Sequence, residues 1–340
     1  MAAQMSSYDT LLHRYTLENA LAMLARFADV REEQYRAMAY RRAIVSLRDP
    51  SVTVGADLSA KIREYRETGR IRELDDAMKR KTYRAMVEFD DILGFGPATS
   101  RELVRKRIYS RAQLMDAIAN GTIHVTRVQE MGLQYYDDLH RPIPRAVVGR
   151  IAVAVLAEVY KEIDDGQDPD RSQVRAEIAG SYRRRAQESR DIDILVARND
   201  DREGRAPNRI FLRAIHDRIH ARYAAADARA FQFIGLTMLG NQKYSFLLRD
   251  TRAEQVVSID LIVVNMVDYW SALVYFTGSR EFNIWLRDQC KKIGMSLSQY
   301  GLRDEFGHVT KLESEEHIFE LLNIPYVEPE ARTHAPLAHE

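Results

Sequence analysis

The chain contains a single cysteine, Cys290, and therefore cannot form an internal disulfide bond. This scarcity fits a reducing, intracellular environment. There is no run of 18 apolar residues, and the first residues lack the basic and then apolar pattern of a signal peptide. We therefore expect an intracellular protein with no membrane partner. A nuclear location is compatible with the sequence, although no import signal is evident.

A net charge is also missing, because 50 basic side chains balance 50 acidic ones. This balance excludes a globally basic nucleic-acid-binding protein but not a locally basic one. The charges are segregated: residues 1–85 carry 16 basic and 12 acidic side chains, whereas residues 312–340 carry seven glutamates and one arginine. Lysine is scarce, with 9 lysines against 41 arginines. A lone lysine in a long stretch is therefore a candidate for a specific role.

The length of 340 residues suggests about two domains, and the patterns of the two halves differ. In the first half, apolar spacings of three and four residues predict only helices, whose ranges are 11–48, 58–66, 79–87 and from Pro97 onward. After a loop at 164–169, short apolar runs predict strands at 174–179, 192–197, 244–248 and 256–264, with helices at 209–225 and 270–276. We therefore predict an α+β protein with an all-α first half and a disordered end from about Arg332.

Three acidic residues lie in the predicted strands of the second half. Asp191 and Asp193 share one face of their strand, because side chains alternate with a period of two. Adjacent carboxylates repel each other unless a cation lies between them, and Mg²⁺ prefers such oxygen ligands. Asp260 lies alone among apolar residues of a second strand; if the strands are neighbours, three carboxylates could hold two ions for phosphoryl transfer. Spacing alone leaves open that Asp193 and Asp260 are solvated acids at strand ends.

The segment Gly-Ser-Tyr-Arg-Arg-Arg at 180–185 precedes the acidic pair. Glycine lets a phosphate approach the backbone closely. Ser181 offers a hydroxyl and an N–H group, and Arg184 offers a planar fork that binds phosphate oxygens. Together with metal-binding carboxylates, this segment predicts a triphosphate site.

These motifs resemble those of the family X DNA polymerases of the polymerase β type. The resemblance rests on GSYRRR at 180–185 with DID at 191–193, SIDL at 258–261, YFTGSREFN at 275–283, SLSQYGLR at 296–303, NIPYVEPE at 323–330 and the hairpin-like GFGPATS at 94–100. It implies a lyase-like helical domain at 1–86, a helix-hairpin-helix domain at 87–141, a nucleotidyltransferase palm with a mixed sheet at 142–266 and a small α+β nucleotide-selecting subdomain at 267–340.

The resemblance also implies the activity and the ligands. A template-directed DNA polymerase of this kind fills short gaps in DNA repair, taking dNTPs and gapped or nicked primer-template DNA, and we expect a monomer. Asp191 and Asp193 would bind two Mg²⁺ ions, with Mn²⁺ as a substitute, and Asp260 would bind the catalytic ion and help activate the primer 3′-hydroxyl. The implied nucleotide-binding residues are Ser181, Arg184, Arg190 through its N–H, Tyr275, Phe276, Gly278, Arg280 and Asn283.

The implied DNA contacts lie in both halves. Lys243, the only lysine between residues 162 and 290, would contact a DNA phosphate, and Arg287 the template strand. In the first half, Gly94 and Gly96 would present N–H groups to a DNA phosphate. The carbonyls of Asp90, Ile92 and Phe95 could hold Na⁺ or K⁺ at the hairpin.

The N-terminal residues also resemble a domain that removes 5′-deoxyribose phosphate through a Schiff base. Lys61, the only lysine among the first 78 residues, matches the nucleophile, and Tyr40 and Arg36 match neighbouring phosphate contacts. Asp57 and Glu73, however, stand where the family commonly has basic residues, which weakens 5′-phosphate binding. A solvated helix lysine on a DNA-binding domain is the alternative for Lys61.

Other departures lie in the palm. Ser258 and Ile262 replace arginines that flank the third aspartate in many members, and Arg185 and Arg190 replace glycines. Two further functions remain open: a nucleotidyltransferase that needs no template, and a DNA-binding scaffold without catalysis. Tyr275 and Phe276 favour the templated enzyme, because template-independent members tend to have Gly-Trp there.

Overall fold

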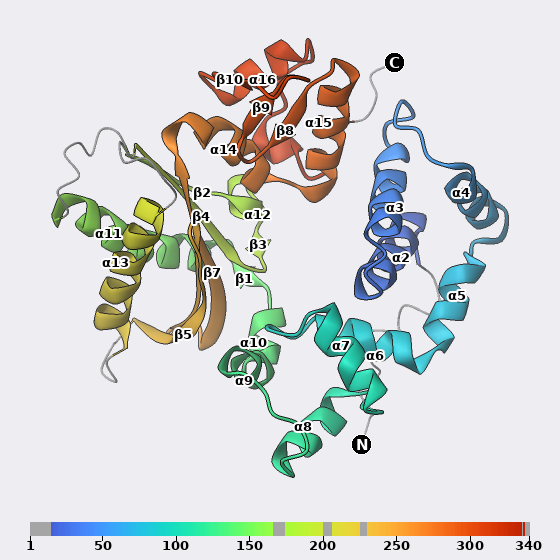
Figure 1. Cartoon of the computed structure of the whole chain (residues 1–340), viewed down its shortest axis with the longest axis horizontal. Coiled ribbons are helices and arrows are strands. Elements are labelled where there is room, and N and C mark those ends of the chain that lie inside the picture. Colours follow the sequence, from blue (N-terminus) through green and yellow to red (C-terminus); the bar gives the residue numbers. More distant parts are fainter. Residues whose placement is uncertain (1–14, 166–173, 200–205, 225–229, 335, 337–340) are drawn as a thin grey trace. The chain divides into compact units, whose positions relative to one another are not determined.

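The computed structural model describes residues 15–165, 174–199, 206–224, 230–334 and 336 (Figure 1). The chain divides into two compact units. The first comprises residues 1–129 and 335–340, and the second comprises residues 130–334.

The described residues of the first unit form helices, as predicted. Their bounds are α2 (Leu17–Val30), α3 (Gln34–Ser46), α4 (Ala56–Thr68), α5 (Arg72–Lys79), α6 (Lys81–Asp90), α7 (Pro97–Arg105) and α8 (Arg111–Ala119). Helix α2 is the centre of the core, since its Leu21, Leu24 and Phe27 are at most 2% exposed. The Thr16 hydroxyl caps α2 by accepting a hydrogen bond from the Asn19 N–H.

The helix ends follow local chemistry, with one correction to the prediction. Gly69 ends α4 in the left-handed conformation, at φ 71°, which suits glycine at this position. Pro97 begins α7, as expected. The helical character predicted for 79–87 is confirmed except at Arg80, which is extended (φ −84°, ψ 108°) and separates α5 from α6.

The second unit contains a five-stranded mixed sheet in the order β2-β4-β7-β6-β5. The bounds of its strands are β2 (Val174–Ile178), β4 (Ile192–Arg198), β5 (Phe231–Leu239), β6 (Lys243–Asp250) and β7 (Gln255–Asn265). Strands β4 and β7 run parallel, and the other neighbours are antiparallel. Four of these strands match the predicted runs, whereas β5 was not predicted.

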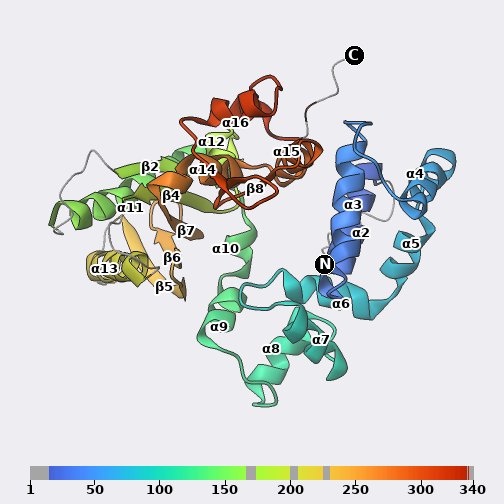
Figure 2. The same ribbon diagram turned by 45° about the horizontal axis from the view of Figure 1, so that its top comes forward.

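Helices cover both faces of this sheet (Figure 2). Helices α11 (Arg145–Asp165) and α13 (Ala206–Tyr223) pack on the face that carries Ile194 and Ile259. Helix α14 (Tyr269–Thr277) packs on the opposite face, against Leu195 and Ile262. Burial on both faces explains why β4 and β7 are nearly continuous apolar runs.

The remaining elements of the second unit are short, except for the 13-residue helix α15. They are α9 (Arg127–Gln134, which begins in the first unit), α10 (Tyr136–His140), β1 (Ile143–Pro144), α12 (Gly180–Arg183), β3 (Glu188–Ser189), η2 (Met266–Asp268), α15 (Arg280–Lys292), β8 (Ser296–Ser298), β9 (Gly301–Arg303), β10 (Val309–Thr310), α16 (Glu315–Leu321) and η3 (Pro329–Ala331).

Two expectations, one about where strands begin and one about disorder near the end of the chain, need correction. Strand β1 pairs with β3, so a short strand does occur before residue 170. Arg332 is fully buried, so ordered structure extends beyond the point where disorder was expected. The predicted 164–169 loop lies mostly outside the described residues, and α11 continues to Asp165.

Candidate active site

The three predicted carboxylates come together at one end of the parallel strand pair. In the register of β4 and β7, Asp193 is the direct partner of Asp260. Asp191 immediately precedes β4 and therefore lies two residues before Asp193. The flanking Ile192 and Ile259 are buried at 1% and 0% exposure, so the strands direct apolar side chains into the core and acids to the other face.

The crowding of negative charge changes the titration of this cluster. Burial, reinforced by the charges of Asp191 and Asp260, raises the pKa of Asp193 to about 7. Burial, followed by the charge of Asp260, also raises the pKa of Asp191. Such a site favours a bound cation, because a cation would relieve both the lost hydration and the mutual repulsion.

A lysine contacts the third acid. Lys243 Nζ lies 2.6 Å from Asp260 Oδ2, so the cation expected to contact a DNA phosphate is paired with a predicted metal ligand. Within the described ranges, no three His, Cys, Asp or Glu side chains are already arranged to hold a metal ion. The donor chemistry nevertheless fits Mg²⁺, since three carboxylates supply the oxygen ligands that this ion prefers.

The turn before the acidic pair packs directly against it. Gly180 begins α12 at φ 57°, and a Cβ at this position would lie 2.6 Å from Asp193 Oδ2. Only glycine meets both conditions without a shift of the carboxylate. The next residue, Ser181, shares a 2.7 Å hydrogen bond between its Oγ and that of Ser189.

Arg184 lies where α12 meets the end of α14. Its Nη1 donates to the Thr277 carbonyl oxygen at 2.6 Å, and a Cβ on Gly278 would lie 3.3 Å from the same nitrogen. Its buried Nε has no hydrogen-bond partner in the part of the chain that the structure describes. Burial lowers the pKa of this guanidinium. A half-buried guanidinium with an unused donor is suited to binding an anion.

The adjacent arginine carries a buried ionic network that the sequence analysis missed. Arg183 donates to both carboxylate oxygens of Glu315, at 3.0 and 2.5 Å. Arg332 Nη1 donates to Glu315 Oε1 at 2.8 Å and is fully buried. This triad ties α12 to α16 and to the end of the chain. Arg183 lies in the GSYRRR motif at 180–185. No local signal connects it with Glu315 or Arg332, which follow it in the chain by 132 and 149 positions.

The two arginines that replace family glycines are both exposed. Arg185 has φ 60°, the left-handed conformation that glycine adopts most easily. Its Nε lies 2.5 Å from Glu330 Oε1. Arg190 directly precedes the acidic pair and was predicted to act through its N–H.

The predicted nucleotide-selecting residues gather at the junction of α14 and α15. The rings of Tyr275 and Phe276 meet edge to face, with centroids 5.1 Å apart. Asn283 Nδ2 donates to the Tyr275 carbonyl oxygen at 2.7 Å, and Arg287 Nε donates to the Asn283 carbonyl oxygen at 3.1 Å. Arg280 is the first residue of α15.

In the first unit, Lys61 lies in a cluster centred on a carboxylate. Lys61 Nζ lies 2.5 Å from Asp57 Oδ1 and 3.3 Å from Glu73 Oε2. Arg36 Nη2 and the Tyr40 hydroxyl both donate to Glu73 Oε1, at 2.7 and 3.0 Å. Tyr40 is only 1% exposed. The structure thus brings the predicted lyase residues together, but around acids.

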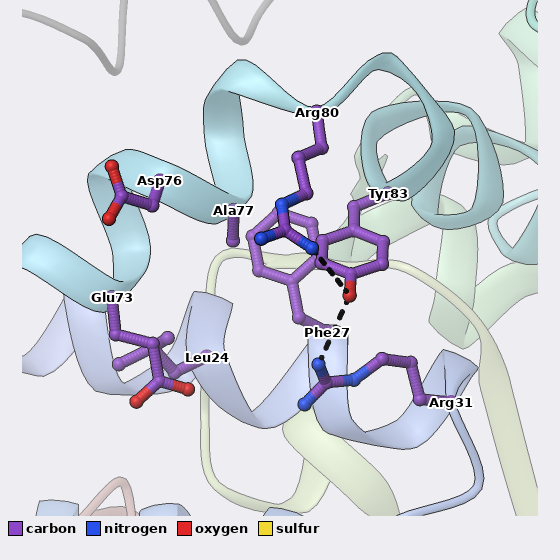
Figure 3. Close-up of a pocket in the computed structure, with 8 residues that line it drawn as sticks. All are labelled: Leu24, Phe27, Arg31, Glu73, Asp76, Ala77, Arg80 and Tyr83. Carbon is purple, nitrogen blue, oxygen red and sulfur yellow. Dashed lines mark hydrogen bonds between the residues drawn. The ribbon is translucent and has the colours of Figure 1, made fainter.

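A separate pocket of about 230 Å³ lies beside this cluster and shares Glu73 with it (Figure 3). Arg31 and Arg80 both donate to the Tyr83 hydroxyl, at 3.4 and 3.5 Å. The hydrogen bond from Arg31 lowers the pKa of Tyr83. Periodicity did not predict this pocket, because α2, α5 and α6 each supply part of its lining.

The predicted hairpin lies between α6 and α7. Gly94 has φ 83°, and a Cβ there would lie 3.1 Å from both the Gln129 nitrogen and Val128 Cγ1. Gly96 caps α7. The Ile92 carbonyl oxygen accepts from the Phe95 N–H at 2.9 Å, which closes a tight turn. DNA and cation binding by this turn stay predictions.

No described helix is both long and apolar enough to cross a membrane.

Comparison with known families gives three matches that follow one another along the chain. The fingers domain of DNA polymerase lambda matches residues 87–140, the DNA polymerase beta palm matches 142–265, and the DNA polymerase beta thumb matches 272–333. The palm match includes all three carboxylates and Arg184.

Curated relatives agree with these matches. Rat DNA polymerase lambda is 27% identical over 98% of this chain and 58% of its own length. A DNA nucleotidylexotransferase of Ambystoma mexicanum is 22% identical over 95% of this chain and 69% of its own length. Its Gallus gallus counterpart is 26% identical over 79% of this chain and 55% of its own length. The chain therefore spans only a little over half the length of rat DNA polymerase lambda.

Proposed function

The chain belongs to family X of the DNA polymerases, and from this premise we propose that it extends a primer along a template and fills short gaps in DNA. The observation that carries the proposal is the pairing of Asp193 with Asp260 on neighbouring parallel strands. Asp191 lies beside this pair, and the turn at Gly180, to which we assign phosphate binding, packs against Asp193. Acids and anion-binding groups therefore meet at one end of the sheet.

The carboxylates are assigned to two Mg²⁺ ions, with Mn²⁺ as an alternative. Asp191 and Asp193 would hold both ions, and Asp260 would hold one of them. When bound, the ions would polarise the phosphates and stabilise the charge of an in-line displacement. Asp260 would lie beside the primer 3′-hydroxyl and help to activate it for attack on the α-phosphate of a dNTP, with pyrophosphate as the leaving group.

The triphosphate would bind at the turn between β2 and β4. Ser181, Arg184 and the N–H of Arg190 are assigned to the β- and γ-phosphates. The unused buried Nε of Arg184 supports this assignment, because an anion would satisfy it. The sugar and base would lie against the residues gathered at the start of α15, namely Tyr275, Phe276, Gly278, Arg280 and Asn283.

DNA would be bound by residues of both units. In the second unit, Lys243 and Arg287 are assigned to the DNA strands. In the first unit, Gly94 and Gly96 would offer N–H groups to a phosphate, and the carbonyls of residues 90, 92 and 95 could hold Na⁺ or K⁺. We further assign residues 1–141 to DNA binding, 142–266 to catalysis and 267–340 to nucleotide selection, in a monomer.

The lyase reaction at Lys61 receives less support than the polymerase reaction. Its amine would have to leave Asp57 and Glu73 before it could attack a sugar aldehyde. These acids would also repel a 5′-phosphate. We propose that Lys61, Arg36 and Tyr40 chiefly join α3, α4 and α5 through Glu73.

A nucleotidyltransferase without a template is the second candidate, and a DNA-binding scaffold without catalysis is a third. Two relatives named DNA nucleotidylexotransferase favour the second. The aromatic pair Tyr275 and Phe276 favours the first. The presence of all three acids and Arg184 argues against a scaffold.

The deciding experiment is gap filling with all four dNTPs, with Mg²⁺ and Mn²⁺ tested separately. We expect extension of a gapped duplex and little extension of a single strand. Asp260→Ala should abolish extension while leaving DNA binding largely intact. Asp217→Ala, at an exposed position on α13, is the matched control. Normal extension by the Asp260 variant would refute the site, and equal extension of the single strand would favour the second candidate.

A further inference from the structure

Lys243 is placed where it can act on the acidic cluster. It begins β6 opposite Ile262 of β7, while Ser245 lies opposite Asp260. Its side chain therefore reaches two positions along the sheet to bring Nζ within 2.6 Å of Asp260 Oδ2. The Lys243 side chain is 43% exposed, whereas that of Asp260 is 20% exposed. The contact is thus accessible from solvent on the lysine side.

The charge of Lys243 acts on all three carboxylates. It pairs directly with Asp260, and it also opposes the rise in the pKa of Asp191 and of Asp193. Arg190 lowers the pKa of Asp191 less than Lys243 does, and Arg184 likewise lowers the pKa of Asp193 less than Lys243 does. The flanking positions of Asp260 on β7, Ser258 and Ile262, carry no cation. Lys243 is therefore the main counter-charge of the cluster.

A metal ion on Asp260 and an ammonium at hydrogen-bond distance from it would repel each other strongly in this partly buried site. Metal binding thus requires Lys243 to move away. The flexible four-carbon stem of a half-exposed lysine permits this movement. A DNA phosphate is a suitable new partner for the released ammonium, because it supplies the negative charge that Asp260 would no longer offer.

We propose that Lys243 couples DNA binding to metal binding. In the free protein its ammonium neutralises Asp260, and a DNA phosphate draws it away and makes that carboxylate available to the metal ion. This inference rests on the proposed function, since both ligands belong to that reaction. Lys243 is then a positioning residue: it holds the metal site closed until DNA is bound.

Thermodynamic linkage makes the proposal measurable. If DNA raises the affinity for the metal ion, the metal ion must raise the affinity for DNA by the same factor. Lys243→Met keeps the aliphatic stem and removes the charge. We expect the free variant to bind Mn²⁺ about 5- to 10-fold more tightly than the unaltered protein, the lower range of typical coupling between sites. Added DNA should enhance Mn²⁺ binding less in the variant.

The experiment measures Mn²⁺ binding by electron paramagnetic resonance, with and without gapped DNA that ends in a 2′,3′-dideoxynucleotide. No turnover is needed. Lys243→Arg keeps the charge and should retain low affinity for Mn²⁺ in the free protein. Lys291→Met, which removes an exposed lysine of α15, is the matched control and should behave like the unaltered protein.

Two results would overturn the inference, and they can be told apart. If Lys243→Met binds Mn²⁺ no more tightly than the unaltered protein and shows the same enhancement by DNA, Lys243 is a DNA contact without a gating role. If Asp260→Asn leaves Mn²⁺ binding intact, the metal site is wrongly assigned. The proposed function then fails together with the coupling role of Lys243.

Discussion

Replacement of Glu315 by glutamine tests how α12, the turn to which we assign phosphate binding, is held in place. The substitution keeps the size of the side chain and removes one negative charge from the triad with Arg183 and Arg332. The carboxylate accepts three hydrogen bonds, from Arg183 Nη1 (3.0 Å), Arg183 Nη2 (2.5 Å) and Arg332 Nη1 (2.8 Å). Its side chain is 4% exposed, against 17% for Arg183 and 0% for Arg332.

The magnitude follows from these burial values. Glu315→Gln leaves Arg183 with only the more distant Glu177, at 3.9 Å, and leaves Arg332 without its carboxylate partner. Water cannot reach the fully buried Arg332 to compensate. Breaking a buried ion pair by removing one partner costs about 3–5 kcal/mol. We expect a loss of this size in the free energy of unfolding, because one carboxylate serves both cations. Since α12 carries Ser181 and ends directly before Arg184, dNTP affinity should also fall.

Urea denaturation in the presence of EDTA measures the loss. Glu320→Gln, an exposed residue of the same helix, is the matched control and should change stability by less than about 0.5 kcal/mol. A double-mutant cycle with Arg183→Met should give an interaction energy of at least about 1 kcal/mol. If Glu315→Gln unfolds with the same midpoint and slope as the unaltered protein, the reasoning about buried charge is wrong.

Three further predictions concern single residues. Gly180→Ala should lower kcat by about 100-fold, because the new Cβ at 2.6 Å displaces the Asp193 carboxylate; a kcat close to that of the unaltered protein would contradict the close approach. Because burial raises the pKa of Asp193 to about 7, its ionised form destabilises the folded metal-free protein, and stability should fall as the pH rises from about 4 to 7. Asp193→Asn should therefore be more stable than the unaltered protein at pH 8 in EDTA, by at least about 1 kcal/mol in thermal melts. The difference in stability should shrink at pH 5. An equal difference at both pH values would exclude ionisation of Asp193 as its cause. Borohydride should trap the protein on an incised abasic site no better than it traps Lys61→Ala, because Asp57 and Glu73 pair with the amine; trapping that is lost in the variant would assign lyase activity to Lys61.

The sequence alone determined the features that depend on neighbouring residues. The period of two in Asp191-Ile192-Asp193 and around Asp260 is a property of any strand, so the acids and the core isoleucines separated correctly. Pro97 marked a helix start through its own backbone preference. The apolar runs of β4 and β7 were readable because both faces of these strands are buried.

Tertiary structure decided the features that depend on which distant segments meet. The sequence could state only that three carboxylates would converge if the two strands were neighbours, and the parallel pairing of β4 with β7 fulfils that condition. No local pattern reveals that Lys243 reaches Asp260 or that Arg332 is buried against Glu315. The physical reason is that an ion pair depends on the distance between charges in space. Residues far apart in the chain acquire that distance only when the sheet and its covering helices have formed.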